Sequence, residues 1–187
     1  MWCRNYAKSV CYSVALARGR HFFMSETEKV CSCFGHSDVE ITEEMKARTR
    51  TAINDAINDG VRVFLFGGIS DFDDLVYELV TENRANNPQL GIKRVFCFAL
   101  DKQLRKPPHW FDRHKEYEAL ECPCKDFDYW YTSIYYRNCA MIDSSDLVLF
   151  YAEERENSGA FKALQYAIKK HKTIKNMFID GLPHGTL

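Results

Sequence analysis

Two glycines and two acids stand where an apolar run gives way to a helical pattern, in "FLFGGISDFDDLVYELV". Gly67 and Gly68 end the apolar run, and Asp71 and Asp73 open the helical pattern. Glycines let backbone amides approach a ligand closely, and a carboxylate can accept hydrogen bonds from ribose hydroxyls. The simplest alternative is a tight turn in which Asp71 or Asp73 caps a helix. The segment predicts either a capped helix start or the wall of a phosphate or ribose pocket.

Other candidate residues follow the first predicted strand, lie within the predicted helix 129–143, and open the predicted helix 158–172. They are Gly35 and His36, Arg137 and Asn138, and Ser158 and Gly159. The free N–H groups of a helix N-terminus attract anions, which suits Ser158 and Gly159 as phosphate ligands. Arg137 would supply a fixed positive charge. Taken singly, His36 is more often an ordinary loop residue, and Arg137 a solvated or ion-paired side chain.

Several other kinds of site have little support. Neither GxGxxG nor GxxxxGK[ST] occurs, so no standard dinucleotide cofactor or P-loop is expected. The eight cysteines include two C-x-C pairs, Cys31/Cys33 and Cys122/Cys124, which are closer together than zinc ligands usually are. We therefore expect no metal site and no cofactor, and we interpret the cysteines as reduced thiols of a cytoplasmic protein.

Short apolar runs alternate with amphipathic segments along the chain. Strands are predicted at 29–34, 61–66, 93–100, 146–152 and 173–178, and helices at 41–60, from residue 72, at 129–143 and at 158–172. Thr42 is expected to cap the first helix. The irregular middle, 101–128, is expected to hold one short helix and a short strand near 118–122. This alternation predicts an α/β fold, a three-layer Rossmann-like parallel sheet with helices on both faces.

Length and charge limit the other possibilities. The chain has 187 residues, which suits one domain, predicted at 24–187 and preceded by an N-terminal extension, 1–23, outside the fold. The formal charge is −1, and without the extension 21 basic and 26 acidic residues give −5. An acidic domain argues against nucleic acid as a partner. No apolar run reaches the roughly 20 residues of a membrane-spanning helix, so no membrane partner is expected.

Four segments together carry a family resemblance over about residues 29–178. "CSCFGHSD", "FLFGGISDFD", "YYRNCAMIDSSDLVLFYA" and "NSGAFKALQYAIKK" resemble, in this order and spacing, the SLOG superfamily, and within it the YpsA-like branch of bacterial and phage-borne proteins. The residues that match its signature are Gly35, His36, Gly67, Gly68, Asp73, Arg137, Asn138, Met141, Asp143, Ser145 and Asp146. The chain departs from the signature at Ser37, where an arginine is usual, and at Ile69 and Asp71. The last glycine-rich turn is reduced to Ser158-Gly159-Ala160.

The resemblance implies a Rossmann-like domain that binds a nucleotide or nucleotide-derived small molecule, as a sensor or accessory protein. The expected ligand-binding residues are Gly35, His36, Gly67, Gly68, Asp73, Arg137, Asn138, Ser158 and Gly159. In this interpretation the backbone amides of Gly67, Gly68, Ser158 and Gly159 face phosphate, and Asp73 faces ribose. Relatives with this fold often form dimers, so a homodimer stays open.

Two other functions are alternatives. The related LOG proteins are phosphoribohydrolases, but Gln165 stands near the position of their catalytic glutamate, and an amide cannot act as a general acid or base. A nucleotide-processing hydrolase would then depend on His36 and one acid, and the sequence leaves open whether the chain is an enzyme. The DprA branch binds single-stranded DNA, a role that the acidic charge disfavours.

Overall fold

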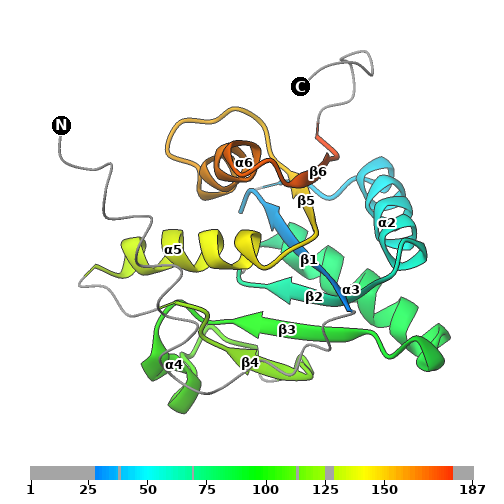
Figure 1. Cartoon of the computed structure of the whole chain (residues 1–187), viewed down its shortest axis with the longest axis horizontal. Helices are drawn as coiled ribbons and strands as arrows, with labels where there is room; N and C mark the ends of the chain where they lie inside the picture. The colour runs from blue at the N-terminus through cyan, green and yellow to red at the C-terminus, as the bar shows by residue number, and fades with distance from the viewer. Residues whose placement is uncertain (1–27, 38, 69, 113, 125–128, 179–187) are drawn as a thin grey trace.

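The computed structural model describes residues 28–178, apart from residues 38, 69, 113 and 125–128 (Figure 1). The predicted extension, 1–23, lies outside the described residues. The strands are β1 (Lys29–Gly35), β2 (Val61–Phe66), β3 (Lys93–Cys97), β4 (Ala119–Glu121), β5 (Leu147–Tyr151) and β6 (Thr173–Asn176). The helices are α2 (Glu43–Asn58), α3 (Asp71–Asn86), α4 (Asp101–Arg105), α5 (Trp130–Asp143) and α6 (Gly159–Lys169), with a short 3-10 turn, η1 (Pro88–Leu90). The predicted alternation of strands and helices is confirmed.

The strands form one six-stranded parallel sheet in the order β4-β3-β2-β1-β5-β6. The chain starts in the middle at β1, builds outward to β4, and then returns to the other side of β1 with β5 (Figure 1). The direction of construction therefore reverses between β1 and β5. In open parallel sheets, ligands bind outside the carboxyl ends of the strands at such a switch point.

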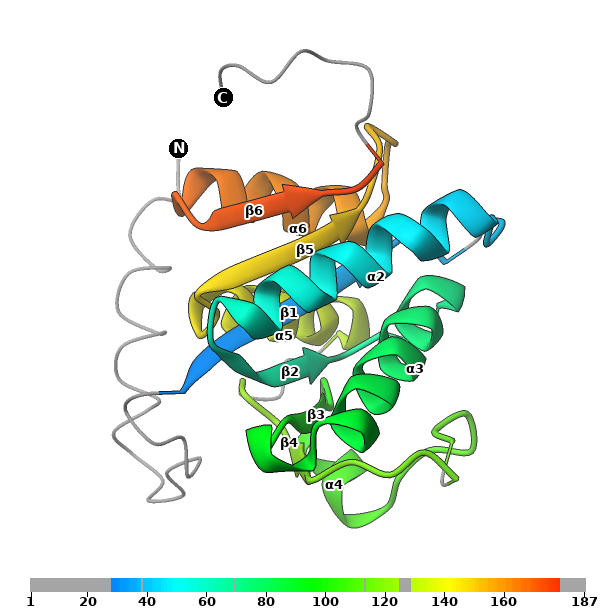
Figure 2. The same ribbon diagram turned by 90° about the vertical axis from the view of Figure 1, so that its right-hand side faces the viewer.

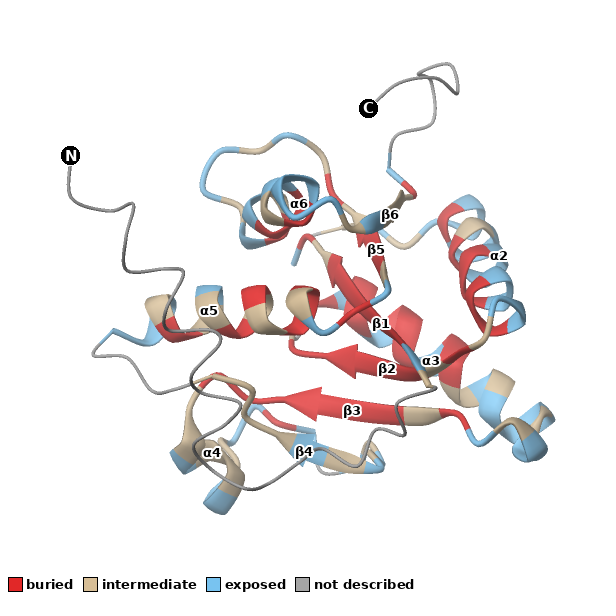
Figure 3. Cartoon of the chain, viewed as in Figure 1, coloured by how far each residue is buried: buried red, intermediate tan, exposed pale blue. Residues whose placement is uncertain are grey.

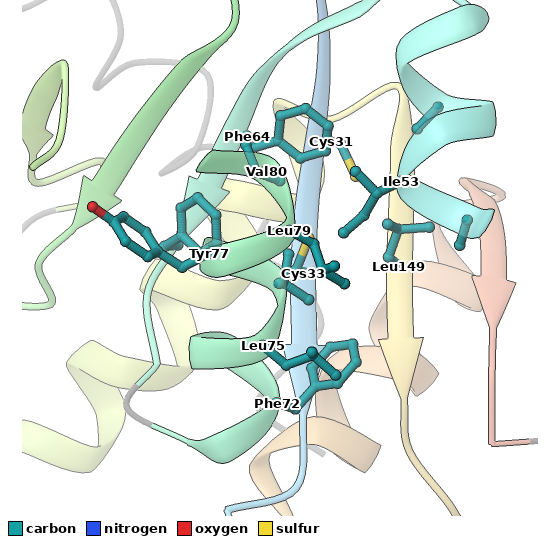
Figure 4. Close-up of a cluster of buried hydrophobic side chains, with 14 of the residues drawn as sticks. Cys31, Cys33, Ile53, Phe64, Phe72, Leu75, Tyr77, Leu79, Val80 and Leu149 are labelled. Atoms are coloured by element: carbon teal, nitrogen blue, oxygen red, sulfur yellow. The ribbon is translucent and has the colours of Figure 1, made fainter. Parts of the chain in front are cut away.

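Two helices cover each face of the sheet, which confirms the three-layer Rossmann-like fold (Figure 2). Helices α2 and α3 cover one face, and α5 and α6 cover the other. Because side chains alternate along a strand, Cys31 and Cys33 point to the α2–α3 face, while Val30 and Phe34 point to the α5–α6 face. Figure 4 shows this first face, where Phe72 of α3 lies against β1.

Burial follows the same layers, with the central strands buried and the outward faces of the helices exposed (Figure 3). The predicted cap of α2 is confirmed, because the Met45 N–H donates to Thr42 Oγ1 at 3.2 Å. The cap expected at Asp71 or Asp73 is wrong by a few residues: Ser70 caps α3, and its Oγ accepts from the Asp73 N–H at 3.1 Å. Within the described ranges, no helix combines the length and apolar character needed to cross a bilayer.

Candidate functional site

His36 joins three elements at the switch point between β1 and β5. Its Nε2 accepts a hydrogen bond from the backbone N–H of Glu153 at 3.0 Å, in the loop after β5. Nε2 is therefore unprotonated, and Nδ1 carries the proton that is donated to Ser158 Oγ, 2.9 Å away. The imidazole is 3% exposed. Because both ring nitrogens are engaged, His36 is built to position the β5 loop and the start of α6.

The start of α6 is exposed and follows a loop that contains Glu153, Glu154 and Glu156. Ser158 is its N-cap and accepts from the Phe161 N–H at 3.2 Å. The first turn of α6 contains no acidic residue. Gly159 is exposed, and a methyl group placed there would meet nothing within 4 Å. The positive end of the α6 dipole is thus open toward the carboxyl edge of the sheet.

Two charged side chains of the protein pack against the glycine pair that follows β2. The Gly67 carbonyl accepts a hydrogen bond from Arg137 Nη1, and a methyl group at Gly67 would lie 2.9 Å from Arg137 Cζ. A methyl group at Gly68 would overlap the Asp73 carboxylate. The glycines are therefore needed for close approach, but the groups that approach them are the protein's own Arg137 and Asp73.

Asp73 lies beneath Gly68 and is 6% exposed. Its Oδ2 accepts a hydrogen bond from the Ser70 hydroxyl at 2.6 Å. Burial raises the pKa of the Asp73 carboxyl to about 6, although the Ser70 hydroxyl and the Arg137 guanidinium oppose the rise. A carboxyl group in this position supports the turn between β2 and α3. It does not line the cleft described below, so it differs from the ribose-facing acid expected from the sequence.

Arg137 is 7% exposed and points under the ends of β2 and β3. Besides Gly67 O, it reaches Cys97 O at 3.5 Å, and its Nε and Nη2 donate to Asn138 Oδ1 at 3.0 and 2.8 Å. Burial lowers the pKa of the Arg137 guanidinium, and Asp73 opposes this effect. Arg137 remains a cation whose donors are directed at strand-end carbonyls, and Asn138 orients it.

Gly35 has a packing role at the end of β1. A methyl group there would come within 2.6 Å of Phe72 Cβ. Phe72 is fully buried and begins the apolar face of α3 (Figure 4). The missing side chain at Gly35 therefore lets α3 start directly against β1.

A cleft of about 270 Å³ opens at the carboxyl ends of β2 and β3. One side is the start of α3, and the other is the segment that joins α4 to β4. The residues that matter most for its chemistry are Gly68, Asp71, Asp74, Trp110, Asp112 and Lys115. Ser37 also lines it, directly after His36 in the chain, so the cleft adjoins the switch point. Gly68 is the only member of the predicted set that lines this cleft.

The described residues from Trp110 to Glu118, which exclude residue 113, are attached to the sheet by aromatic and ionic contacts. Phe111 packs edge-to-face on Phe96 and at a tilt on Phe98, with ring centroids 4.9 and 5.1 Å apart. Glu118 Oε1 and Oε2 accept from Arg94, at 2.8 Å for the Nη2 bond and 3.2 Å for the Nε bond. This attachment gives the cleft a defined second wall.

Lys115 is the one cation among the described lining residues, and its ammonium group is already paired with a carboxylate. Its Nζ pairs with the Asp74 carboxylate and lies 5.1 Å from the centre of the Tyr77 ring. Asp112 Oδ1 accepts from the His114 N–H at 2.8 Å. Asp71, exposed at the cleft, has no hydrogen bond or ion pair with any described residue. The cleft therefore presents acceptors and an aromatic surface.

The structure divides the predicted residues into two groups along one edge. His36, Ser158 and Gly159 meet at the switch point, with Gly35 one residue before His36. The second group is Gly67, Gly68, Asp73, Arg137 and Asn138, which support each other beneath the β2–α3 turn. The sequence analysis considered Asp71 as part of a pocket wall but left it out of the expected ligand-binding residues, and it missed Trp110. The available signal for Trp110 was the "HWFD" segment after the Pro107-Pro108 breaker, in the connection between α4 and β4.

The residues that bear on the hydrolase alternative and on a metal site are placed as follows. Gln165 is exposed in the middle of α6, two turns beyond the Ser158 cap. Glu153 forms an ion pair with Arg155 at 2.8 Å. Among the described residues, no set of three or more His, Cys, Asp or Glu side chains is arranged to hold a metal ion. The described cysteines are free thiols.

Comparison with known proteins gives no family assignment. A scan against protein-family models found no match, and a search of curated protein sequences found no significant relative. The fold and the geometry of the carboxyl edge are therefore the basis for the function proposed below.

Proposed function

We propose that the chain binds a nucleotide or nucleotide-derived small molecule along the carboxyl edge of its sheet, as a sensor or accessory protein of the SLOG type. The phosphate group would lie at the start of α6. The observation that carries this proposal is the 2.9 Å contact between His36 and Ser158. It holds the start of α6 beside the switch point, and the first turn of this helix contains no acidic residue. A ready helix N-terminus at such a point suits a phosphate group.

Charge supports α6 over α3 as the phosphate end. The first turn of α3 contains Asp71, Asp73 and Asp74, which already satisfy the positive end of its dipole. The first turn of α6 contains none. We therefore assign the phosphate to Ser158 and Gly159, two strands away from the glycine pair along the same edge, and no longer to Gly67 and Gly68, which the sequence analysis had also given to phosphate.

The histidine that the hydrolase alternative would use as its base is already engaged. Both nitrogens of His36 are engaged, and Gln165 cannot transfer protons. A single-stranded DNA role stays a less favoured prediction, because the described cleft is acidic. The proposal is therefore limited to binding.

A matched pair at Gly159 tests the proposal without disturbing the core. Gly159→Asp places a carboxylate at the proposed phosphate position, and Gly159→Asn is the neutral control of equal size, since the space there is open. Ligand that binds only the folded state stabilises it, by about 2.7 kcal/mol at a hundredfold excess over Kd. We expect nucleoside monophosphates to raise the Tm of the wild type and of Gly159→Asn, and to raise that of Gly159→Asp much less.

The screen also has a clear negative result. No rise in Tm with any nucleoside mono-, di- or triphosphate at millimolar concentration would contradict the proposal. Equal rises in Gly159→Asp and Gly159→Asn would keep nucleotide binding but remove the phosphate from the start of α6.

A further inference from the structure

The cleft between the start of α3 and the Trp110–Glu118 segment has a chemistry different from that of the α6 start. Its described charged side chains are Asp71, Asp74, Asp112 and Lys115, so carboxylates outnumber ammonium groups. Lys115 is neutralised by Asp74. A carboxylate is acceptor-only, so the cleft favours a ligand group that donates hydrogen bonds and carries no negative charge.

Trp110 gives the cleft a flat surface. The indole is 37% exposed, and its ring centroid lies 6.4 Å from those of Phe96 and Phe98. These two phenylalanines are buried, so the indole is supported from the core and still has surface to offer. Any nucleobase can stack on an aromatic side chain, and such stacking strengthens binding roughly five- to hundredfold.

We infer that this cleft is the nucleoside subsite of the bound ligand, with the base stacked on Trp110 and its N–H groups directed at Asp71. The inference rests on the proposed function, and it adds the part of the ligand that the α6 start does not hold. Ser37 connects the two places, because it lines the cleft and follows His36, which holds Ser158. A volume of about 270 Å³ suits one nucleoside rather than a whole dinucleotide.

The acceptors define a preference among bases. Guanine presents two adjacent donors, N1–H and the N2 amine, to a carboxylate. Adenine and cytosine present one amine, and uracil presents a single N–H between two carbonyl acceptors. The inference therefore orders the ligands as guanosine first, adenosine and cytidine next, and uridine last.

Tryptophan fluorescence tests the subsite directly. The chain has three tryptophans, so Trp2→Phe with Trp130→Phe leaves Trp110 as the only one. We expect guanosine and GMP to quench this fluorescence saturably, and uridine to quench it less. Trp110→Ala should weaken GMP binding roughly five- to hundredfold, as loss of base stacking does.

Two control variants separate the possible outcomes. Trp130 is exposed at the start of α5 and is not among the residues that line the cleft, so Trp130→Ala should bind GMP as the wild type does. Asp71→Asn should reduce the preference for guanosine over uridine. If GMP raises the Tm equally in the wild type and in Trp110→Ala without quenching, the subsite is overturned while the proposed function stands. If no nucleoside or nucleotide raises the Tm, both fall.

Discussion

The starts of α3 and α6 use the same cap and present opposite surfaces. Each begins with a serine whose Oγ accepts from the N–H three residues later, Ser70 from Asp73 and Ser158 from Phe161. At α3 the next turn holds three acids, and the Asp73 carboxylate lies against Gly68. At α6 the turn holds none, and Gly159 faces open space. A glycine next to a helix start is therefore not enough to predict an anion site, because the acids of the first turn decide its charge.

The largest expected effect comes from adding one methyl group at the α3 side. Gly35→Ala forces Cβ against Phe72 in the core, and overpacking of this kind lowers the free energy of unfolding by about 3 kcal/mol. Gly159→Ala, at the α6 side, should change it by less than about 0.5 kcal/mol. Urea unfolding measures both. Equal losses would show that the two starts do not differ in packing.

Asp73 makes the α3 start sensitive to pH. Its pKa is about 6 in the folded protein and 3.8 in an unfolded reference. The folded state therefore binds the proton more tightly, so its stability relative to Asp73→Asn is greatest below pH 3.8 and is lost as pH rises through 6. A difference of about two pH units corresponds to about 3 kcal/mol. Urea titrations of the wild type and of Asp73→Asn from pH 4 to 7 should show the difference in free energy of unfolding falling with pH. A difference that stays constant or rises would contradict a buried Asp73 carboxyl with a raised pKa.

Replacing each of the two capping serines should lower the free energy of unfolding, but only one replacement should change its pH dependence. Ser70→Ala removes a cap and the hydroxyl that donates to Asp73 Oδ2 at 2.6 Å, and it should lower the free energy of unfolding by about 2 kcal/mol. Ser158→Ala removes a cap and a partner of His36, at about 1 kcal/mol. Because the Ser70 hydroxyl lowers the pKa of Asp73, only Ser70→Ala should move the pH transition upward. Shifts of similar size in both variants would argue against this coupling.

The smallest effect is a gain in stability at α6. Gly159→Asp adds an acid to a first turn that has none. Its interaction with the helix dipole should raise the free energy of unfolding by about 0.3–1 kcal/mol relative to Gly159→Asn. This gain should fall as salt is added. Thermal unfolding at low and high ionic strength measures it. A loss of stability in Gly159→Asp would mean that the α6 start is already rich in negative charge.

The fold could be predicted from the sequence because its signals are local and repeated. The alternation of apolar runs with amphipathic segments predicted the parallel sheet, and Thr42 predicted the start of α2. The short helix and short strand expected in 101–128 are α4 and β4. These features depend on residues within a few positions of each other, so a single chain is sufficient to find them.

The side-chain directions at the site were harder to predict. Arg137 was expected to face a ligand, but it shares the inward face of α5 with Ser133 and Met141, four residues to either side. That spacing was visible in the sequence and favoured burial. The same spacing separates Asp71 from Asp73. Asp73 lies three residues before Val76 and four before Tyr77, on the buried face of α3, whereas Asp71 and Asp74 are exposed.

The most direct test of the account is isothermal titration of guanosine and of GMP against Gly159→Asp and Gly159→Asn. If the phosphate lies at the α6 start and the nucleoside in the cleft, GMP binds Gly159→Asn with a lower Kd than guanosine. In Gly159→Asp that advantage is lost, while the Kd of guanosine stays the same. If the carboxylate weakens guanosine and GMP equally, or weakens neither, the division of the carboxyl edge into a phosphate end and a nucleoside end is contradicted.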